Sequence, residues 1–339
     1  MQTTDKIYDI LTIGRSSIDL YSNDIGSPFV EITSFGAYVG GSPLNIAVGC
    51  KRLGLSTSFL TAVGNDQVGK FIIHFLEKEG INTSSIPTVE GTRSSAVILG
   101  IEPPDRFPLV YYRENCSDIN INLEHIRQAN IAQYRSVMFS GTAFSKDPSR
   151  TSMFYAIEEA KKHGAVTALD IDFRADQWFD PLAFGVTIRA ALPYMDFVLG
   201  TEEEILAAFM TDPKQLEIKH QQISAPEIRG NIDNAIQEIL NKGVKTLIVK
   251  RGADGASIFK KGEPEIKVPG FPVEVVNVLG AGDSFAAGFM YGYLKGWDLF
   301  KAVRMANATG AIMVTKHGCA NFMATLEEAM DFANSKGGL

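Results

Sequence analysis

The stretch that decides the fold is NVLGAGDSFAAGFM, residues 277–290. The small residues Gly280, Ala281 and Gly282 form a turn that runs directly into an apolar helix. Such a turn lets the backbone approach a ligand closely, and the N-terminus of the helix favours negative charge. The first turn of this helix also carries Asp283. The stretch therefore predicts an anion-binding cradle with a carboxylate at its mouth.

The cradle has two interpretations. In the structural one, Asp283 only stabilises the helix dipole and contributes about 0.3–1 kcal/mol. In the functional one, the cradle holds the charge that develops on a transferred phosphoryl group, and Asp283 accepts the proton of an attacking hydroxyl. The remainder of the chain decides between the two.

Apolar strand-like runs alternate with helix-like runs along most of the chain. Strands are expected at 7–13, 58–63, 137–139, 166–171, 197–199 and 246–249, with helices between them such as 151–163 and 234–241. Continuous apolar strands separated by helices predict a doubly wound, mostly parallel α/β sheet. Residues 29–39 and 93–112 alternate in polarity instead, and they predict a small antiparallel sheet that projects as a lid over a cleft.

Composition and length limit the remaining possibilities. The chain has 339 residues, 45% of them hydrophobic, and 32 Lys plus Arg against 39 Asp plus Glu, a net charge of −7. The acidic balance argues against binding to duplex nucleic acid, and no apolar run approaches the roughly 18 residues of a membrane span. Without an evident linker, we expect one domain over 1–339, with a lid from about 15–40 and 90–115. Without a leader-like N-terminus, we expect a cytoplasmic protein.

Two separated motifs resemble the signatures of one family. Residues 277–290 resemble the C-terminal signature of the ribokinase-like (PfkB) sugar kinases, and GGSPLNIA at 40–47 resembles their N-terminal signature. Two motifs in the right order are much more specific than one. The resemblance implies a doubly wound α/β fold with a β-sheet lid over the sugar, and a phosphotransferase that uses ATP and Mg²⁺.

The resemblance also implies roles for individual residues. Asp19, Gly41 and Asn45 match positions that contact hydroxyl groups of the sugar. Asp283 matches the catalytic base, and the amides of residues 280–282 match the anion hole. On their own, Asp19 is equally compatible with a turn and Asn45 with a polar helix position.

A second group of residues matches the nucleotide side of the family's site. Lys250, Gly252 and Gly255 belong to a loop that follows a strand, although Asp254-Gly255 also suits a plain hairpin turn. Asn307 lies where an adenosine contact is expected, and its structural alternative is an amide on a helix surface.

Two positions depart from the family pattern. Glu203 matches the acid that orders magnesium through water, but Gly200 stands where Asn is usual. Asn277 stands where an Asp often supports a monovalent cation, so the family's potassium ion is left open as a further cofactor.

Two arginines point to an acidic sugar. Arg113 ends a lid strand and Arg174 follows a central strand, and guanidinium groups match carboxylates in geometry. Arg174 could bind either the acid or the transferring phosphate, and its structural alternative is a salt bridge with a neighbouring Asp. With the motifs at 200–204 and 318–323, these residues resemble the branch of the family that phosphorylates 5-dehydro-2-deoxygluconate on its 6-hydroxyl. The alternatives are a 2-dehydro-3-deoxygluconate kinase and a fructokinase or ribokinase.

Other classes of protein fit less well. GNDQVGK at 64–70 matches the skeleton of a P-loop, but Phe71 replaces the magnesium-binding Ser or Thr and Asp66 would place a carboxylate in the cradle. An NAD(P)-binding oxidoreductase lacks its G-x-G-x-x-G fingerprint after the first strand. A non-catalytic sugar-binding protein stays open as the alternative. Open edges of the lid strands favour a homodimer.

Overall fold

The computed structural model describes residues 6–102, 106–218 and 226–339. Its main sheet has eight strands in the order β16-β15-β14-β11-β10-β9-β1-β4. Six of them run parallel: β4 (Thr57–Leu60), β1 (Tyr8–Ile13), β9 (Tyr134–Ser140), β10 (Val166–Asp170), β11 (Phe197–Thr201) and β14 (Thr246–Lys250). The strands β15 (Ala256–Phe259) and β16 (Ile266–Val268) continue the sheet antiparallel at one edge.

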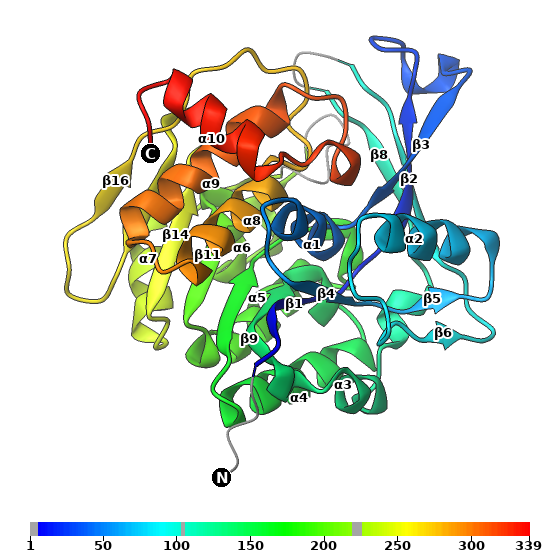
Figure 1. Cartoon of the computed structure of the whole chain (residues 1–339), viewed down its shortest axis with the longest axis horizontal. Helices are drawn as coiled ribbons and strands as arrows, with labels where there is room; N and C mark the ends of the chain where they lie inside the picture. The colour runs from blue at the N-terminus through cyan, green and yellow to red at the C-terminus, as the bar shows by residue number, and fades with distance from the viewer. Residues whose placement is uncertain (1–5, 103–105, 219–225) are drawn as a thin grey trace.

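Helices cover both faces of this sheet, because its strands are apolar on both sides. In β1, Leu11 and Ile13 contribute to the core on one face and Ile10 to the core on the other. The first face carries α3 (Leu123–Ala129), α4 (Ser149–Lys162), α5 (Pro181–Ala191), α6 (Glu202–Ala208) and α7 (Ile232–Asn241). The second carries α1 (Ser42–Arg52), α8 (Ala281–Leu294), α9 (Leu299–Val314) and α10 (Leu326–Ser335). The predicted doubly wound α/β fold is confirmed (Figure 1). Within the described part of the chain, no helix combines the length and the hydropathy needed to cross a bilayer.

A second sheet projects from one end of the molecule (Figure 1). This lid sheet has the order β3 (Phe35–Gly40), β2 (Ser17–Ser22), β7 (Ser95–Leu99), β8 (Leu109–Tyr112). Its outer pairs are antiparallel as expected, but the central pair β2 and β7 is parallel. Local alternation of polar and apolar residues predicts that a segment is a strand but not which strand it pairs with. The pairing of β2 with β7 across a long connection could therefore not be predicted from this pattern.

Residues 64–70, which match the sequence pattern of a P-loop, form the N-terminal cap of a helix instead. Between β5 (Val63–Gly64), which pairs with β6 (Thr88–Val89), and α2 (Gln67–Lys78), the Asp66 carboxylate accepts hydrogen bonds from the amides of Gly69 (2.7 Å) and Ser94 (2.8 Å). The amide that a phosphate would use is therefore already taken by a carboxylate. A further two-stranded sheet pairs β12 (Leu216–Glu217) with β13 (Glu227–Ile228).

Candidate active site

Two cavities meet at the start of α8. The first, the lid pocket, lies between the lid sheet, α1 and α8, and Asp19, Asn45 and Tyr111 are among its lining residues. The second, the long groove, has a volume of about 610 Å³ and runs along the ends of β10, β11 and β14. Both cavities are lined by Asp283 and Arg174. Carboxyl ends of parallel strands are the usual place for ligands in open α/β sheets.

Asp283 stands where the two cavities join. It lies in the first turn of α8, whose N-cap Gly280 adopts a left-handed conformation with φ of 76°. The side-chain amide of Asn45, in α1, donates a hydrogen bond of 2.7 Å to Asp283 Oδ2. Burial raises the pKa of Asp283, and the nearby Asp172 carboxylate raises it further. A carboxylate with a raised pKa is a stronger base at neutral pH.

The first turn of α8 leaves backbone amides free at the place where the sequence predicts an anion cradle. Amides in the first turn of a helix have no carbonyl one turn earlier to donate to, so those of Gly282 and Asp283 are available to an anion. The amide of Ala281 already reaches the carbonyl of Val278 at 3.4 Å. A Cβ at Gly282 would lie 3.1 Å from Lys250 Nζ, so a cation stands directly beside the cradle.

Gly40 makes room for Asp19 in the lid pocket, and Gly41 makes room for the nearby backbone of Arg15. A side chain at Gly40 would collide with the Asp19 carboxylate, and Gly41, at φ of 111°, passes directly over the carbonyl of Arg15. The Ser17 hydroxyl donates a hydrogen bond of 2.6 Å to Asp19 Oδ1. Burial raises the pKa of Asp19 to about 6, although the cation of Arg15 opposes the shift. Asp19 and Asn45 line the lid pocket with Gly41, as the sequence led us to expect.

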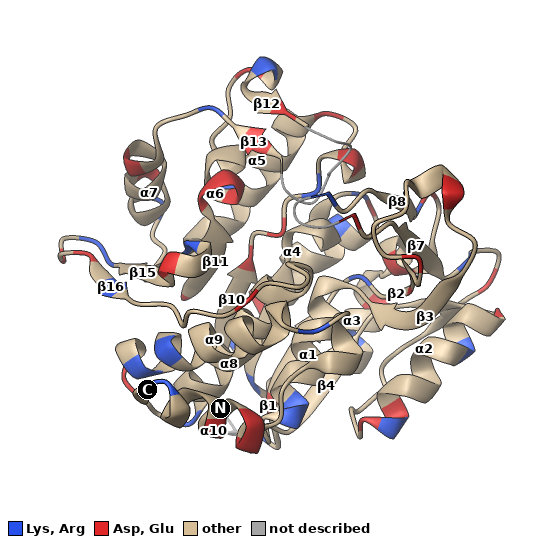
Figure 2. Cartoon of the chain, turned by 90° about the horizontal axis from the view of Figure 1, so that it is seen from above, with Lys and Arg blue, Asp and Glu red and all other residues tan. Residues whose placement is uncertain are grey.

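Lys250 carries its charge at the floor of the long groove. Its ammonium group pairs with Asp170 Oδ1 at 3.0 Å and with Glu204 Oε2 at 3.4 Å. Burial alone would lower the pKa of Lys250, but the two carboxylates outweigh burial and raise it. In Figure 2 acidic positions mark α6 and the neighbourhood of β10, the elements from which these two carboxylates come. Lys250 is thus a fixed cation beside the cradle.

Arg174 is held at the junction of the two cavities. Its guanidinium pairs with Asp172 Oδ1 at 2.9 Å and approaches Glu204 Oε1 at 3.8 Å. Asp172 has a φ of 41°, a conformation that is rare for a residue with a side chain and that clusters at functional sites. The hydroxyls of Ser140 and Thr142 donate to its other oxygen, Oδ2, at 2.8 and 3.0 Å. This bracing fixes the direction of Arg174.

The remaining residues predicted for the nucleotide side all line the long groove: Gly252, Gly255 and Asn307. Asn307 does so indirectly, because its amide donates to the carbonyls of Val268 (3.1 Å) and Pro269 (2.9 Å). Its N–H groups are spent on the backbone that follows β16. Asn307 therefore shapes the wall of the groove and is buried rather than on the helix surface.

The run of acids at the start of α6 presents Glu204, and not the expected Glu203, to the groove. Glu203 is exposed and does not line the groove, whereas Glu204 does. Thr201 and Glu204 form a capping box at the start of α6, and this folds the Glu204 side chain back towards the end of β11. Asn277 is buried, and its carbonyl oxygen accepts from the Leu279 amide at 3.0 Å. No group of three or more potential metal ligands occurs among the residues with assigned positions.

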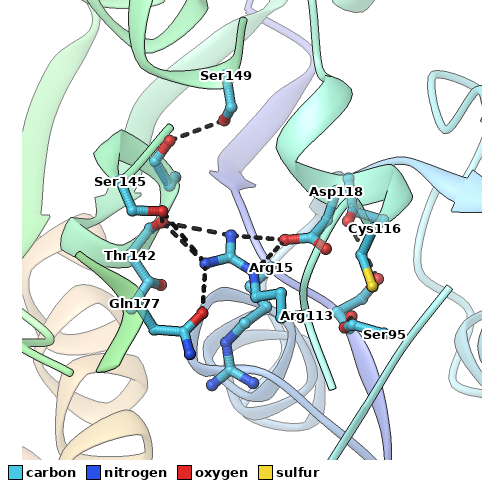
Figure 3. A network of polar contacts seen from close by, with 12 residues as sticks. Arg15, Ser95, Arg113, Cys116, Asp118, Thr142, Ser145, Ser149 and Gln177 are labelled. Carbon is cyan, nitrogen blue, oxygen red and sulfur yellow. Dashed lines mark hydrogen bonds and ion pairs between the residues drawn. The ribbon is translucent and has the colours of Figure 1, made fainter. Parts of the chain in front are cut away.

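Arg113 does not line the lid pocket. It is 5% exposed, and its guanidinium pairs with Asp118 at 2.6 Å and also donates to the Thr142 carbonyl and to Gln177 Oε1 (Figure 3). This geometry does not support the expectation that Arg113 binds a carboxylate, since its donors are already used. Besides Arg174, Arg15 lines the pocket, and sequence reasoning missed it. Its signal is its place directly after β1, at the same edge of the sheet as Arg174.

Several known proteins are similar to this chain. Residues 8–326 match the family described as pfkB family carbohydrate kinase. A 5-dehydro-2-deoxygluconokinase from Geobacillus thermodenitrificans is 34% identical over 328 residues, 96% of this chain and 93% of that protein. One from Clostridium tetani is 32% identical over 333 residues, 98% of this chain and 94% of that protein. A solved structure of fructokinase from Vibrio cholerae, with fructose, ADP and calcium ion bound, has a TM-score of 0.81 at 23% identity and covers 97% of this chain and 99% of its own.

Proposed function

Because the chain belongs to the PfkB family of carbohydrate kinases, which transfer a phosphoryl group to an alcohol, we propose that it phosphorylates 5-dehydro-2-deoxygluconate on the 6-hydroxyl. ATP is the donor and Asp283 is the base. The observation that carries the proposal is the position of Asp283, which lines both cavities and follows the anion cradle. A base at this junction can act on a hydroxyl in one cavity while the phosphates lie in the other.

The lid pocket binds the sugar. Asp19 accepts hydrogen bonds from sugar hydroxyls, and Gly41 allows the backbone to approach the ligand. Asn45 can both donate and accept hydrogen bonds in this pocket. Its Nδ2 donates to Asp283, while its Oδ1 is buried without a partner among the described residues. That free oxygen can accept a hydrogen bond from a hydroxyl of the sugar, and satisfying it contributes to binding. The terminal hydroxyl then lies next to Asp283.

The transfer step moves one proton and one phosphoryl group. Asp283 accepts the proton of the 6-hydroxyl, the hydroxyl oxygen bonds to the γ-phosphorus, and the bond from that phosphorus to the β-phosphate oxygen breaks to release ADP. The amides at the start of α8 and the cations of Lys250 and Arg174 stabilise the charge on the phosphoryl group. Closure of the lid sheet excludes water, which limits the hydrolysis of ATP.

Magnesium fits the groove as the companion of the nucleotide. Mg²⁺ is usually bound by one or two carboxylates and the substrate's own phosphates, and Asp170 and Glu204 supply carboxylates of this kind at the groove. When bound, the ion neutralises phosphate charge. Both carboxylates also hold Lys250, so they would contact the ion through water rather than surround it.

An acidic substrate suits the charges of the lid pocket. The curated relatives that cover almost the whole chain are named for 5-dehydro-2-deoxygluconate. Two arginines, Arg15 and Arg174, line the pocket, and guanidinium groups match a carboxylate in geometry. Arg174 lies at the junction, where it serves the transferring phosphate.

The proposal is tested by the release of ADP with 5-dehydro-2-deoxygluconate, 2-dehydro-3-deoxygluconate, fructose and ribose, each with ATP and Mg²⁺. We expect kcat/KM to be highest for 5-dehydro-2-deoxygluconate. Preference for another of the four would replace the substrate but keep the kinase chemistry. Binding of the sugars without any turnover would instead favour a non-catalytic sugar-binding protein.

A further inference from the structure

Arg15 is a buried cation that the transfer step does not use. It follows β1 and leads into β2, so it lies under the lid sheet at the edge of the main sheet. Only 5% of its surface is exposed, and its guanidinium lies 5.1 Å from the ring centre of Tyr111 in β8. A charged group this deeply buried normally has an ionic partner, because an unpaired charge is costly to desolvate.

The partners of Arg15 are incomplete. Its one side-chain hydrogen bond to a described residue, from Nη1 to the Ser17 hydroxyl, is long at 3.4 Å, and its Nε is buried without a partner in the described part of the chain. Among the described residues, no carboxylate forms an ion pair with it. The two other arginines of this region differ, since the buried Arg113 pairs with Asp118 and the half-buried Arg174 pairs with Asp172. In Figure 3 the guanidinium of Arg15 points away from the network that satisfies Arg113.

We propose that Arg15 binds the carboxylate of the sugar acid and thereby sets the preference of the lid pocket for an acid over a neutral sugar. The inference rests on the proposed function, because it names the residue that recognises one end of that substrate. Unused guanidinium donors that line the pocket match a carboxylate, which accepts two parallel hydrogen bonds. Tyr111 covers the guanidinium from the lid side and keeps it from water.

Arg15 has one competing role, as the counter-charge of Asp19. The Arg15 cation lowers the pKa of Asp19 against the larger opposite effect of burial, so it helps to keep that carboxylate ionised. In this role the loss of Arg15 would weaken the binding of every substrate whose hydroxyls contact Asp19, whether the substrate is charged or neutral. In the proposed role the loss of Arg15 weakens the binding of the acid alone. A neutral analogue of the same substrate therefore distinguishes between the two roles of Arg15.

The probes are 5-dehydro-2-deoxygluconate and its C1 amide, compared by kcat/KM in ADP release. We expect the wild type to prefer the acid by at least about tenfold, the size expected for hydrogen bonds to a charged group. Arg15→Met should raise KM for the acid by a similar factor, change kcat much less, and bring the acid and the amide within about threefold of each other. Arg113→Lys is the matched control, and its preference for the acid should be that of the wild type.

Each outcome decides the inference. If the wild type prefers the acid and Arg15→Met keeps that preference, the inference fails and the proposed function stands. If the wild type turns over only neutral sugars, the proposed function fails and the inference fails with it, before any variant is measured. Affinity for ATP checks that Arg15→Met is folded. Should it not fold, Arg15→Lys takes its place, because a point charge cannot make the paired contact, and an unchanged KM for the acid would overturn the inference.

Discussion

Asp283 is the residue on which the chemistry depends. Asp283→Asn keeps the shape of the side chain and a carbonyl oxygen for the hydrogen bond from Asn45, but it removes the base. We expect kcat to fall at least about 10²-fold, because general-base catalysis contributes that much or more. Affinity for ATP, measured by calorimetry, should change little. Turnover close to that of the wild type would remove Asp283 from the role of base.

Asp19, which the proposed function uses to bind the sugar, lowers the stability of the fold when it is ionised. Its pKa is about 6 in the folded protein against an ordinary value of 3.8, so the folded state holds the proton more tightly than the unfolded state does. The free energy of unfolding therefore falls as pH rises between these two values, and ionised Asp19 destabilises the fold above them. Asp19→Asn should raise the free energy of unfolding by about 1–3 kcal/mol near about pH 8 and leave it almost unchanged near about pH 4.

The measurement for Asp19 is urea unfolding of the wild type and of Asp19→Asn at both pH values, with kcat/KM for the sugar alongside. The variant should be the more stable protein at the higher pH and the weaker kinase. A variant that is less stable than the wild type at the higher pH would contradict the argument from burial.

Residues of this site differ in how far the sequence predicts them. Asp283 and its glycines lie within one local motif, a turn that enters a helix, so sequence alone locates them. Glu203 and Glu204 are neighbours in a run of acids, and only the capping box with Thr201 decides which of them turns inwards. The end of a lid strand suggests that Arg113 faces the pocket, whereas Arg113 pairs with Asp118, a buried acid that no local pattern marks as its partner.

Elements position the catalytic groups through close helix contacts. The helices α8 and α9 approach each other at Gly288, where a Cβ would lie 2.9 Å from Ala306 Cα and 3.0 Å from the carbonyl oxygen of Met305. Gly288→Ala should therefore push the two helices apart and lower the free energy of unfolding by about 1–3 kcal/mol. Because α8 carries Asp283 at its start, kcat should fall as well.

The matched control for Gly288 is Gly310, in α9, where a Cβ would make only an ordinary contact of 3.5 Å with the carbonyl oxygen of Ala281. Gly310→Ala should raise the free energy of unfolding by about 0.5–1 kcal/mol, as alanine does in a helix. Urea unfolding of both variants tests the pair. Equal losses of stability would mean that close packing is not what Gly288 provides.

Element order is well predicted for the parallel strands of the main sheet, since an α-helix lies between each of them and the next, whereas β15 and β16 follow β14 without an α-helix and are not predicted. The lid sheet is predicted less completely. Its strands show alternation, but the parallel pairing of β2 with β7 joins segments separated by α1, β4 and α2. Such pairings are set by tertiary packing, so the sequence indicates a lid and leaves its topology open.

The whole molecule presents apolar side chains on the edges of the lid sheet. Phe35, Val110 and Tyr112 are exposed on its edge strands β3 and β8. Open edge strands with exposed apolar side chains favour pairing with a second copy of the chain. We expect light scattering to give twice the 37.0 kDa of one chain. Val110→Glu should shift the mass towards the monomer, and a monomeric wild type would contradict the prediction.

We propose for the whole molecule that Asp283, as the base, directs the phosphoryl group to the 6-hydroxyl of the sugar acid. The identity of the product tests this most directly. The wild type and Asp283→Asn are each incubated with ATP, Mg²⁺ and 5-dehydro-2-deoxygluconate, and the product is followed by phosphorus NMR coupled to the sugar protons. We predict phosphate on the 6-oxygen with the wild type and almost none with Asp283→Asn. Phosphate on another oxygen, or an equal yield from both proteins, would contradict the account.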